Sequence, residues 1–374
     1  RNMVNKLLNF IKHLNRQRNL KVKPLKLAIK LYLLNRKKKV RSLLTPQDYS
    51  SVAILMNDQG IGDAIVTSYL IESLRKNAFK VFVVVEKRIA FLFDEFISVD
   101  GIIFYDRKKK TELIKEYLGN TEIDVVIDLV DKGPNSVRRS QIIKALNPLH
   151  TIGFNQEKYK LYDTSIDYHD YTSHISKRSQ KVLDLMNIKV DRVSYYLNIP
   201  PCNEKAVNDF LKPYKSLGKK IIIFNPFGSN SARSFSNSQI EIILSFLSQY
   251  SNFITIVVGE PDKISNIKST NNIIINQMAS FFCTVALVKH SDFVITVDTS
   301  IVHLASHYDK KMVCVYNNRM IDNKFINNFV WGPNYANAIQ VFTDENVNTG
   351  LGDLISNFDI NIMLKQLENE LHKL

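Results

Sequence analysis

The chain has 374 residues, 45% hydrophobic and 23% charged, a composition that argues against a disordered chain and leaves room for two domains with full cores. Its net charge is +14, and its three cysteines lie far apart without a CxxC pair, which argues against a zinc site or a disulfide framework and suits a reducing compartment. No apolar run approaches the ~18 residues of a membrane-spanning helix.

The excess charge lies in residues 1–44, which hold 14 Lys or Arg and no Asp or Glu, whereas the rest of the chain is balanced. We predict two short apolar and basic helices there, interrupted at Pro24. Such helices suit an anionic membrane surface. The residues expected to contact it are Lys26, Lys30, Arg36, Lys37, Lys38 and Lys39. Two alternatives stay open: binding to nucleic acid, which the scarcity of aromatic residues disfavours, or a helical extension packed on its own protein.

After this segment, strands and helices alternate. The strands predicted in the first half are 52–56, 80–86, 101–106, 124–130 and 150–154, and the helices are 63–76, 87–96, 111–119, 135–147 and 176–187. Because most of these strands are apolar runs without alternation, they predict a parallel sheet covered on both faces.

A boundary follows at 195–220, which contains three prolines and a helix, and the alternation then restarts. The predicted strands are 219–225, 252–260, 271–276, 292–298 and 311–317, and the helices are 236–250, 280–291, 299–309 and 354–374. The pattern predicts an α/β protein with two doubly wound Rossmann-like domains facing a cleft. We place a basic extension at 1–45 and the domains at 46–200 and 201–350, followed by a C-terminal helix at 351–374.

In open α/β sheets, ligands bind beyond the carboxyl ends of the strands. One such loop, 224–236 (FNPFGSNSARSFS), has small residues around Gly228 and Ser229 that let backbone amides approach an anion. Arg233 adds a guanidinium that suits a phosphate, although the loop lacks the GKS or GKT of a Walker motif. The alternative is a serine-capped turn with a solvated arginine.

A second loop lies in ITVDTSIVHLASH, residues 295–307. The strand is expected to end at Asp298, after which Thr299 and Ser300 cap a helix whose positive end suits a pyrophosphate. His303 lies one turn further on, either facing the cleft or packed in the core. At the end of the predicted strand 252–260, Glu260 is placed to accept hydrogen bonds from ribose hydroxyls.

The loop NDQGIGD, residues 57–63, resembles a dinucleotide fingerprint, but Ile65 stands where the third glycine would be. We instead interpret its glycines as bringing a helix start and Asp63 to the cleft, where a carboxylate can take a proton from an attacking hydroxyl. The alternative is that Asp63 only caps its helix. The histidine-bearing stretch 168–174 (YHDYTSH) is interpreted as a polar loop, and no group of side chains is placed for a metal ion.

Three segments together carry a family resemblance: IGDAIVTSYLIESLRKN, NPFGSNSARSFS and VDTSIVHLASHYDKKMVCVY. In this order and spacing they resemble glycosyltransferase family 9, the ADP-heptose:lipopolysaccharide heptosyltransferases of Gram-negative bacteria, over about residues 50–345. The resemblance implies a GT-B fold in which the final helix crosses back to the first domain. It also implies inverting transfer without a metal or other cofactor.

Residue by residue, the resemblance places Asp63 on the catalytic aspartate and Arg233 on a basic donor-phosphate residue. Asp298, Thr299 and His303 fall on the family's D-T-x-x-x-H motif. Ser300 departs from the pattern, because the family usually has glycine there. Glu260 lies near the residue that contacts the nucleoside.

The expected partners are a nucleotide-diphosphate sugar and a lipid-linked glycan, with no nucleic acid. Lys132, Arg138 and Arg139 follow the strand 124–130 and are expected to hold an anionic acceptor such as a Kdo or phosphorylated sugar. The expected location is cytoplasmic, peripheral on the inner face of the membrane. Two other functions stay open: a sugar-nucleotide epimerase or hydrolase with the same donor site, and a non-catalytic binding protein anchored by residues 1–44.

Overall fold

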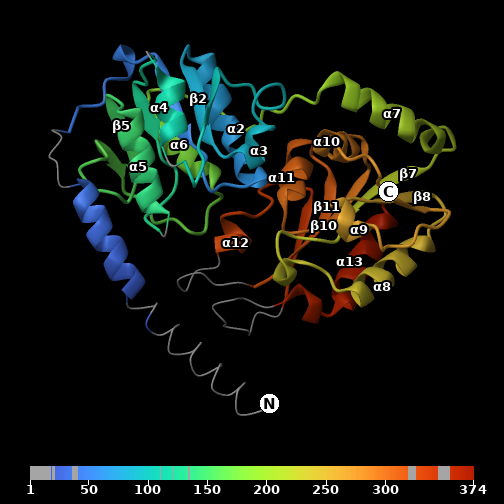
Figure 1. Cartoon of the computed structure of the whole chain (residues 1–374). Coiled ribbons are helices and arrows are strands. Elements are labelled where there is room, and N and C mark those ends of the chain that lie inside the picture. Colours follow the sequence, from blue (N-terminus) through green and yellow to red (C-terminus); the bar gives the residue numbers. More distant parts are fainter. Residues whose placement is uncertain are drawn as a thin grey trace.

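The structure is a computed structural model that describes residue 18 and residues 22–35, 41–109, 111–119, 121–133, 135–318, 326–343 and 354–374. Its core consists of two six-stranded sheets, one in each of two domains that lie side by side (Figure 1). Most strands of both sheets are buried, and helices pack on them. The predicted α/β architecture with two doubly wound domains is thereby confirmed.

The first sheet consists of β1 (Ser51–Leu55), β2 (Lys80–Val85), β3 (Gly101–Phe104), β4 (Val125–Ile127), β5 (His150–Phe154) and β6 (Thr164–Ile166). The helices of this domain are α2 (Ile61–Lys76), α3 (Lys87–Ala90), α4 (Glu112–Leu118), α5 (Ser136–Leu146) and α6 (Ser176–Leu185), with a 3-10 turn, η1, at Pro46–Asp48. The strand β6 was not predicted, because its three half-buried residues carry no apolar run. The predicted helix 87–96 is wrong in length, since α3 ends at Ala90.

The second sheet consists of β7 (Lys220–Asn225), β8 (Phe253–Val257), β9 (Ile273–Ile275), β10 (Phe293–Val297), β11 (Lys311–Tyr316) and β12 (Ala338–Phe342). The helices here are α7 (Pro201–Ser216), α8 (Asn237–Ser248), α9 (Pro261–Ile264), α10 (Phe281–His290), α11 (Ser300–His307), α12 (Ile326–Phe329) and α13 (Ile360–Leu371), with 3-10 turns η2 (Ser231–Arg233) and η3 (Ile355–Asn357). Sequence reasoning missed β12, which lies at the edge of the sheet and is only half-buried.

The two sheets share one topology. Their strand orders are β3-β2-β1-β4-β5-β6 and β12-β11-β10-β7-β8-β9, and the neighbouring strands pair in parallel. The order reverses direction between β1 and β4 in one sheet and between β7 and β10 in the other. Such switch points are where ligands bind in open α/β sheets. The loops that start α2 and α11 leave these points, and the two helices pack against each other across the domain boundary.

The C-terminal helix α13 belongs to the second domain, and the prediction that it crosses back to the first domain is wrong. Met363 and Leu367 are buried in the same hydrophobic cluster as the strands β7 and β11. The preceding turn is held there as well, because the Gln239 side-chain amide donates to the backbone carbonyls of Ile355 and Phe358. The apolar face of α13 is thus buried within the second domain.

Residues 22–35 form a helix that projects from the side of the first domain (dark blue in Figure 1). Pro24 is the third described residue of this helix, and because residues 19–21 lie outside the described residues, the predicted interruption near Pro24 stays a prediction. The predicted helix before it falls outside the described residues, apart from Arg18, as do Arg36, Lys37, Lys38 and Lys39. Among the residues described, no helix has the length and apolar character needed to span a membrane.

Candidate active site

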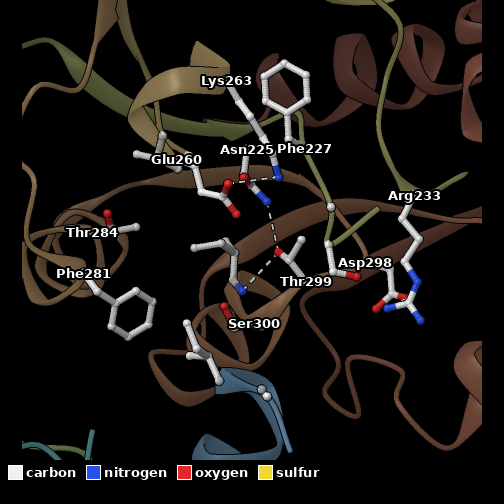
Figure 2. A pocket seen from close by; sticks show the side chains of 18 of the residues that line it. Asn225, Phe227, Arg233, Glu260, Lys263, Phe281, Thr284, Asp298, Thr299 and Ser300 are labelled. Atoms are coloured by element: carbon white, nitrogen blue, oxygen red, sulfur yellow. Dashed lines mark hydrogen bonds and ion pairs between the residues drawn. The ribbon is translucent and has the colours of Figure 1, made fainter. Parts of the chain in front are cut away.

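A cavity of about 680 Å³ lies between the two domains, within the size range of small-molecule sites. The first domain contributes the loop Gly60 to Asp63 together with Arg88, and the second contributes loops after β7, β8, β9 and β10. The site residues predicted from sequence that line this cavity are Asp63, Ser229, Arg233, Glu260, Asp298, Thr299, Ser300 and His303. Figure 2 shows the second-domain wall, with the start of α2 (blue ribbon) approaching Ser300.

Asp63 lies in the first turn of α2, where Gly60 is the N-cap. The Gly60 N–H donates to Asp63 Oδ2 at 2.8 Å, so the carboxylate caps its helix as well as lining the cavity. Burial raises the pKa of Asp63 above its usual value, although the Gly60 hydrogen bond and the nearby Arg88 and Arg233 oppose the shift. A raised pKa makes this carboxylate a stronger base than an exposed aspartate.

Gly62 brings the start of α2 against α11. A β-carbon on Gly62 would lie 3.2 Å from His303 Cδ2. His303 itself is buried, and burial together with the neighbouring His174 lowers its pKa to about 3, so that its imidazole is neutral. The His303 ring also lies against Trp331, which lines the cavity, with ring centroids 6.0 Å apart.

His174 was not predicted to be near the site, because the stretch 168–174 does not follow a candidate strand. The structure places it in the domain interface, with its ring centroid 6.0 Å from that of His303. The adjacent Ile175 N–H donates to the carbonyl of Val330 in the second domain. The only sequence signal was the histidine itself, since the contact depends on how the domains pack.

The predicted N-cap of α11 is confirmed. Thr299 Oγ1 accepts from the Ile301 N–H, and the Asn225 side-chain amide donates to the same hydroxyl at 3.0 Å (Figure 2). Asn225 thereby ties the end of β7 to the start of α11. Thr299, Ser300 and Ile301 line the cavity, and the positive end of the helix dipole at this helix start favours an anion there.

Arg233 pairs with the buried Asp298, with 3.3 Å between Nη1 and Oδ2. Burial raises the pKa of Asp298 to about 6, against the opposing charge of Arg233. The loop that carries Arg233 is wound tightly around Gly228, where a β-carbon would come within 2.6 Å of Arg233 Cβ and the Arg233 carbonyl oxygen. This close approach explains the glycine and fixes the arginine beside the cavity.

Two ends of the cavity differ in character. The Arg233–Asp298 pair lies on one side of Thr299, and Glu260 lies on the other (Figure 2). Glu260 is exposed and pairs with Lys263 at 3.2 Å, beside the aromatic side chain of Phe227. Lys263 was not predicted, because a single lysine in a short surface helix carries no distinguishing signal.

Of the three residues predicted to hold the acceptor, Arg138 and Lys132 reach the surface, whereas Arg139 is buried. Arg138 Nη1 lies 2.8 Å from Asp58 Oδ1, next to Arg107, which pairs with the same oxygen at 2.6 Å. Arg88 donates to the Gln59 carbonyl, so that arginines from α3, α5 and the turn after β3 contact the loop before Asp63. Lys132 is exposed, with its ammonium 5.8 Å from the centre of the Tyr159 ring.

Arg139 is different, and its assignment to the acceptor site is corrected. Its side chain is buried and pairs with Asp128, with 2.9 Å between Nε and Oδ2. The Tyr162 hydroxyl donates to the same carboxylate at 2.7 Å. Because Arg139 follows Arg138 on α5, the two side chains point in different directions, and only Arg138 reaches the surface.

The sequence profile of glycosyltransferase family 9 (heptosyltransferase) matches residues 112–328. The chain belongs to this family. This chain is 27% identical over 321 residues to an Escherichia coli (strain K12) protein provisionally named lipopolysaccharide heptosyltransferase 4. The match covers 83% of this chain and 86% of that protein.

Two solved structures are similar in fold. The family 9 glycosyltransferase of Veillonella parvula DSM 2008 has a TM-score of 0.69 at 15% identity and covers 88% of this chain and 99% of its own. Escherichia coli heptosyltransferase WaaC with ADP has a TM-score of 0.61 at 14% identity and covers 86% and 98%. These structures share the two-domain GT-B fold of this chain, and its family membership makes it a glycosyltransferase.

Proposed function

We propose that this protein transfers a heptose from ADP-heptose to a lipopolysaccharide core or another lipid-linked glycan, with inversion at the anomeric carbon. The observation that carries the proposal is the position of the Asp63 carboxylate, which lines the same cavity as Arg233 and the start of α11. A base from one domain thus faces a phosphate-binding wall from the other. The structure of the similar WaaC with ADP supports the donor class.

In the proposed reaction, Asp63 takes the proton of an acceptor hydroxyl. The hydroxyl oxygen forms a bond to the anomeric carbon while the bond from that carbon to the diphosphate breaks, and ADP leaves. Arg233 and the amides at Ser229 and Thr299 to Ser300 would stabilise the negative charge on the leaving diphosphate. These groups supply positive charge without a metal ion, and the two domains would exclude water that could hydrolyse the donor.

Asp298 and His303 would complete the donor site together with Glu260. The neutral imidazole of His303 can donate or accept one hydrogen bond without adding charge. Glu260, at the opposite end of the cavity from Arg233, would accept hydrogen bonds from the ribose hydroxyls. Lys263 would hold the Glu260 carboxylate in place. The donor would therefore lie with its diphosphate at Thr299.

The acceptor would be anionic. Arg138 and Arg88 contact the loop before Asp63, and Lys132 is exposed next to Tyr159. Carboxylate or phosphate groups on a Kdo or core sugar would pair with these side chains. We further propose that the enzyme works at the cytoplasmic face of the inner membrane, held there by the basic segment 1–44.

A screen of ligand-induced shifts in melting temperature tests the donor class, with ADP, UDP, GDP and CMP sugars compared at equal concentration. ADP-heptose should give the largest shift. Product analysis then separates transfer from the alternatives, because an epimerase or hydrolase would convert the donor without an acceptor. No shift with any sugar nucleotide, or conversion that needs no acceptor, would contradict the proposal.

A further inference from the structure

The helix of residues 22–35 is attached to the first domain by one face and by its C-terminal end. Leu31 is buried, at 1% exposure, and the Asn35 side chain accepts a hydrogen bond from the Leu161 N–H at 3.1 Å. The Asn35 amide also donates to the Leu31 carbonyl. Most of the other side chains on this described helix are exposed.

The uncovered surface includes an apolar face made of Leu25, Ile29, Tyr32 and Leu33, with exposed fractions of 62%, 51%, 69% and 56%. Their spacing of i, i+4, i+7 and i+8 places them within an arc of about 100° on the helix. Four large exposed apolar side chains in a single arc are unlike the scattered apolar residues that every protein surface carries. The arc therefore indicates a docking surface.

The charge beside this face identifies the partner. Lys23, Lys26 and Lys30 are exposed and project from the arc of the helix that adjoins the apolar face. No acidic residue occurs in residues 1–44, so nothing there would repel an anionic surface. An apolar face flanked by lysines is the pattern of a helix that lies in the interface of a bilayer, with its apolar side chains among the acyl chains and its ammonium groups at the phosphates.

We propose that the exposed apolar face of the helix 22–35 docks the enzyme on an anionic lipid bilayer. The inference rests on the proposed function, which holds the enzyme at the membrane by segment 1–44, and it adds which face of that segment enters the lipid. The helix packs on the connection between β5 and β6, which also carries Tyr159, next to Lys132 of the proposed acceptor surface. A docked helix would thus hold this surface near the lipid that carries the acceptor.

Vesicle co-sedimentation of the full chain tests the proposal. We would compare phosphatidylcholine vesicles with vesicles that also contain about 30% phosphatidylglycerol, because the surface potential comes from anionic lipid. One variant replaces Leu25, Ile29, Tyr32 and Leu33 with Ser, and a second replaces Lys23, Lys26 and Lys30 with Gln. A control replaces Leu217, Ile242 and Ile362 with Ser, which are exposed apolar residues of the second domain.

The parent chain and the control should bind the anionic vesicles, and each helix variant should bind at least about tenfold more weakly. The exchanged side chains are exposed, so the melting temperature and its shift by ADP should not change. That shift separates a failure of docking from a failure of the proposed donor site. Equal binding of the parent and the apolar-face variant would overturn the proposal. Equal binding of the parent chain to neutral and anionic vesicles would also overturn the proposal. A dimer in sedimentation analysis that the apolar-face variant abolishes would overturn it as well, because a second copy of the chain would then cover the face.

Discussion

Gly62 lies directly against the imidazole of His303, so that the helix carrying the proposed base touches the helix that would bind the diphosphate. A β-carbon at Gly62 would lie 3.2 Å from His303 Cδ2 and 3.6 Å from Nε2. Because these atoms belong to different domains, this contact sets the distance between Asp63 and the donor wall. A glycine that resembled part of a nucleotide fingerprint is better explained by this close approach.

Replacing Gly62 with Ala should therefore reduce turnover by about tenfold to a hundredfold, because the start of α2 would be displaced from α11. Steady-state kinetics with saturating donor would measure the effect. Gly133→Ala is the control, since a β-carbon there would meet nothing closer than the Asp131 carbonyl at 3.9 Å. Equal loss of activity in both variants would count against the contact.

Asp63→Asn should lower turnover by about a hundredfold to ten-thousandfold, because the amide cannot take a proton. The Asn side chain can still accept the hydrogen bond from Gly60, so nucleotide binding and melting temperature should be close to those of the wild type. In the wild type, activity should fall as pH falls through the raised pKa of Asp63. A variant that retained near-normal turnover would exclude Asp63 as the base.

Arg233→Gln should weaken donor binding by about tenfold or more, because charge-assisted contacts to a phosphate are lost. It would also leave the buried Asp298 without its cationic partner. Arg138→Gln is the matched comparison, since Arg138 lies on the other domain and should affect the acceptor KM alone. Calorimetric titration with ADP distinguishes the two, and an unchanged Kd in Arg233→Gln would remove this residue from the donor site.

The sequence predicted most of the fold, because fully buried parallel strands leave long apolar runs such as 52–56 and 292–298. It also located the loops after these strands, where nucleotide sites form in such sheets. It could not separate Arg138 from Arg139, which are identical in type and adjacent, since only packing decides which one is buried. Nor could it find His174, whose partner His303 lies far along the chain in the other domain, or the attachment of α13 within the second domain.

The buried ion pair of Arg139 and Asp128 should contribute to the stability of the first domain. Arg139→Met should lower the free energy of unfolding by about 3–5 kcal/mol, because it leaves the Asp128 carboxylate buried without its ion-pair partner. Arg138→Gln should change it by less than about 1 kcal/mol, because the Arg138 side chain is 36% exposed and Asp58 keeps Arg107 as an ion-pair partner. Urea denaturation of the two variants measures the difference. If both were equally stable, the buried pair would not have the structural role assigned to it.

The interface pair His174 and His303 should make the stability of the enzyme depend on pH. Burial lowers the pKa of His174 to about 4 and that of His303 to about 3, whereas the unfolded histidines titrate at their ordinary value of 6.5. Below this value the unfolded chain binds protons that the folded chain does not, so the free energy of unfolding falls as pH falls from about 7 toward 4.

Replacing His174 with Asn removes one of the two titrating groups. Between pH 7 and pH 5 the variant should therefore lose about 2 kcal/mol less stability than the wild type, even if it is less stable at pH 7. Denaturant titrations at the two pH values measure this difference. His169→Asn serves as the control, because His169 is exposed on the same loop and pairs with the exposed Asp167. If the stability of His174→Asn fell with pH as steeply as that of His169→Asn, His174 would have to be charged or exposed in the folded enzyme, and its place in the domain interface would be wrong.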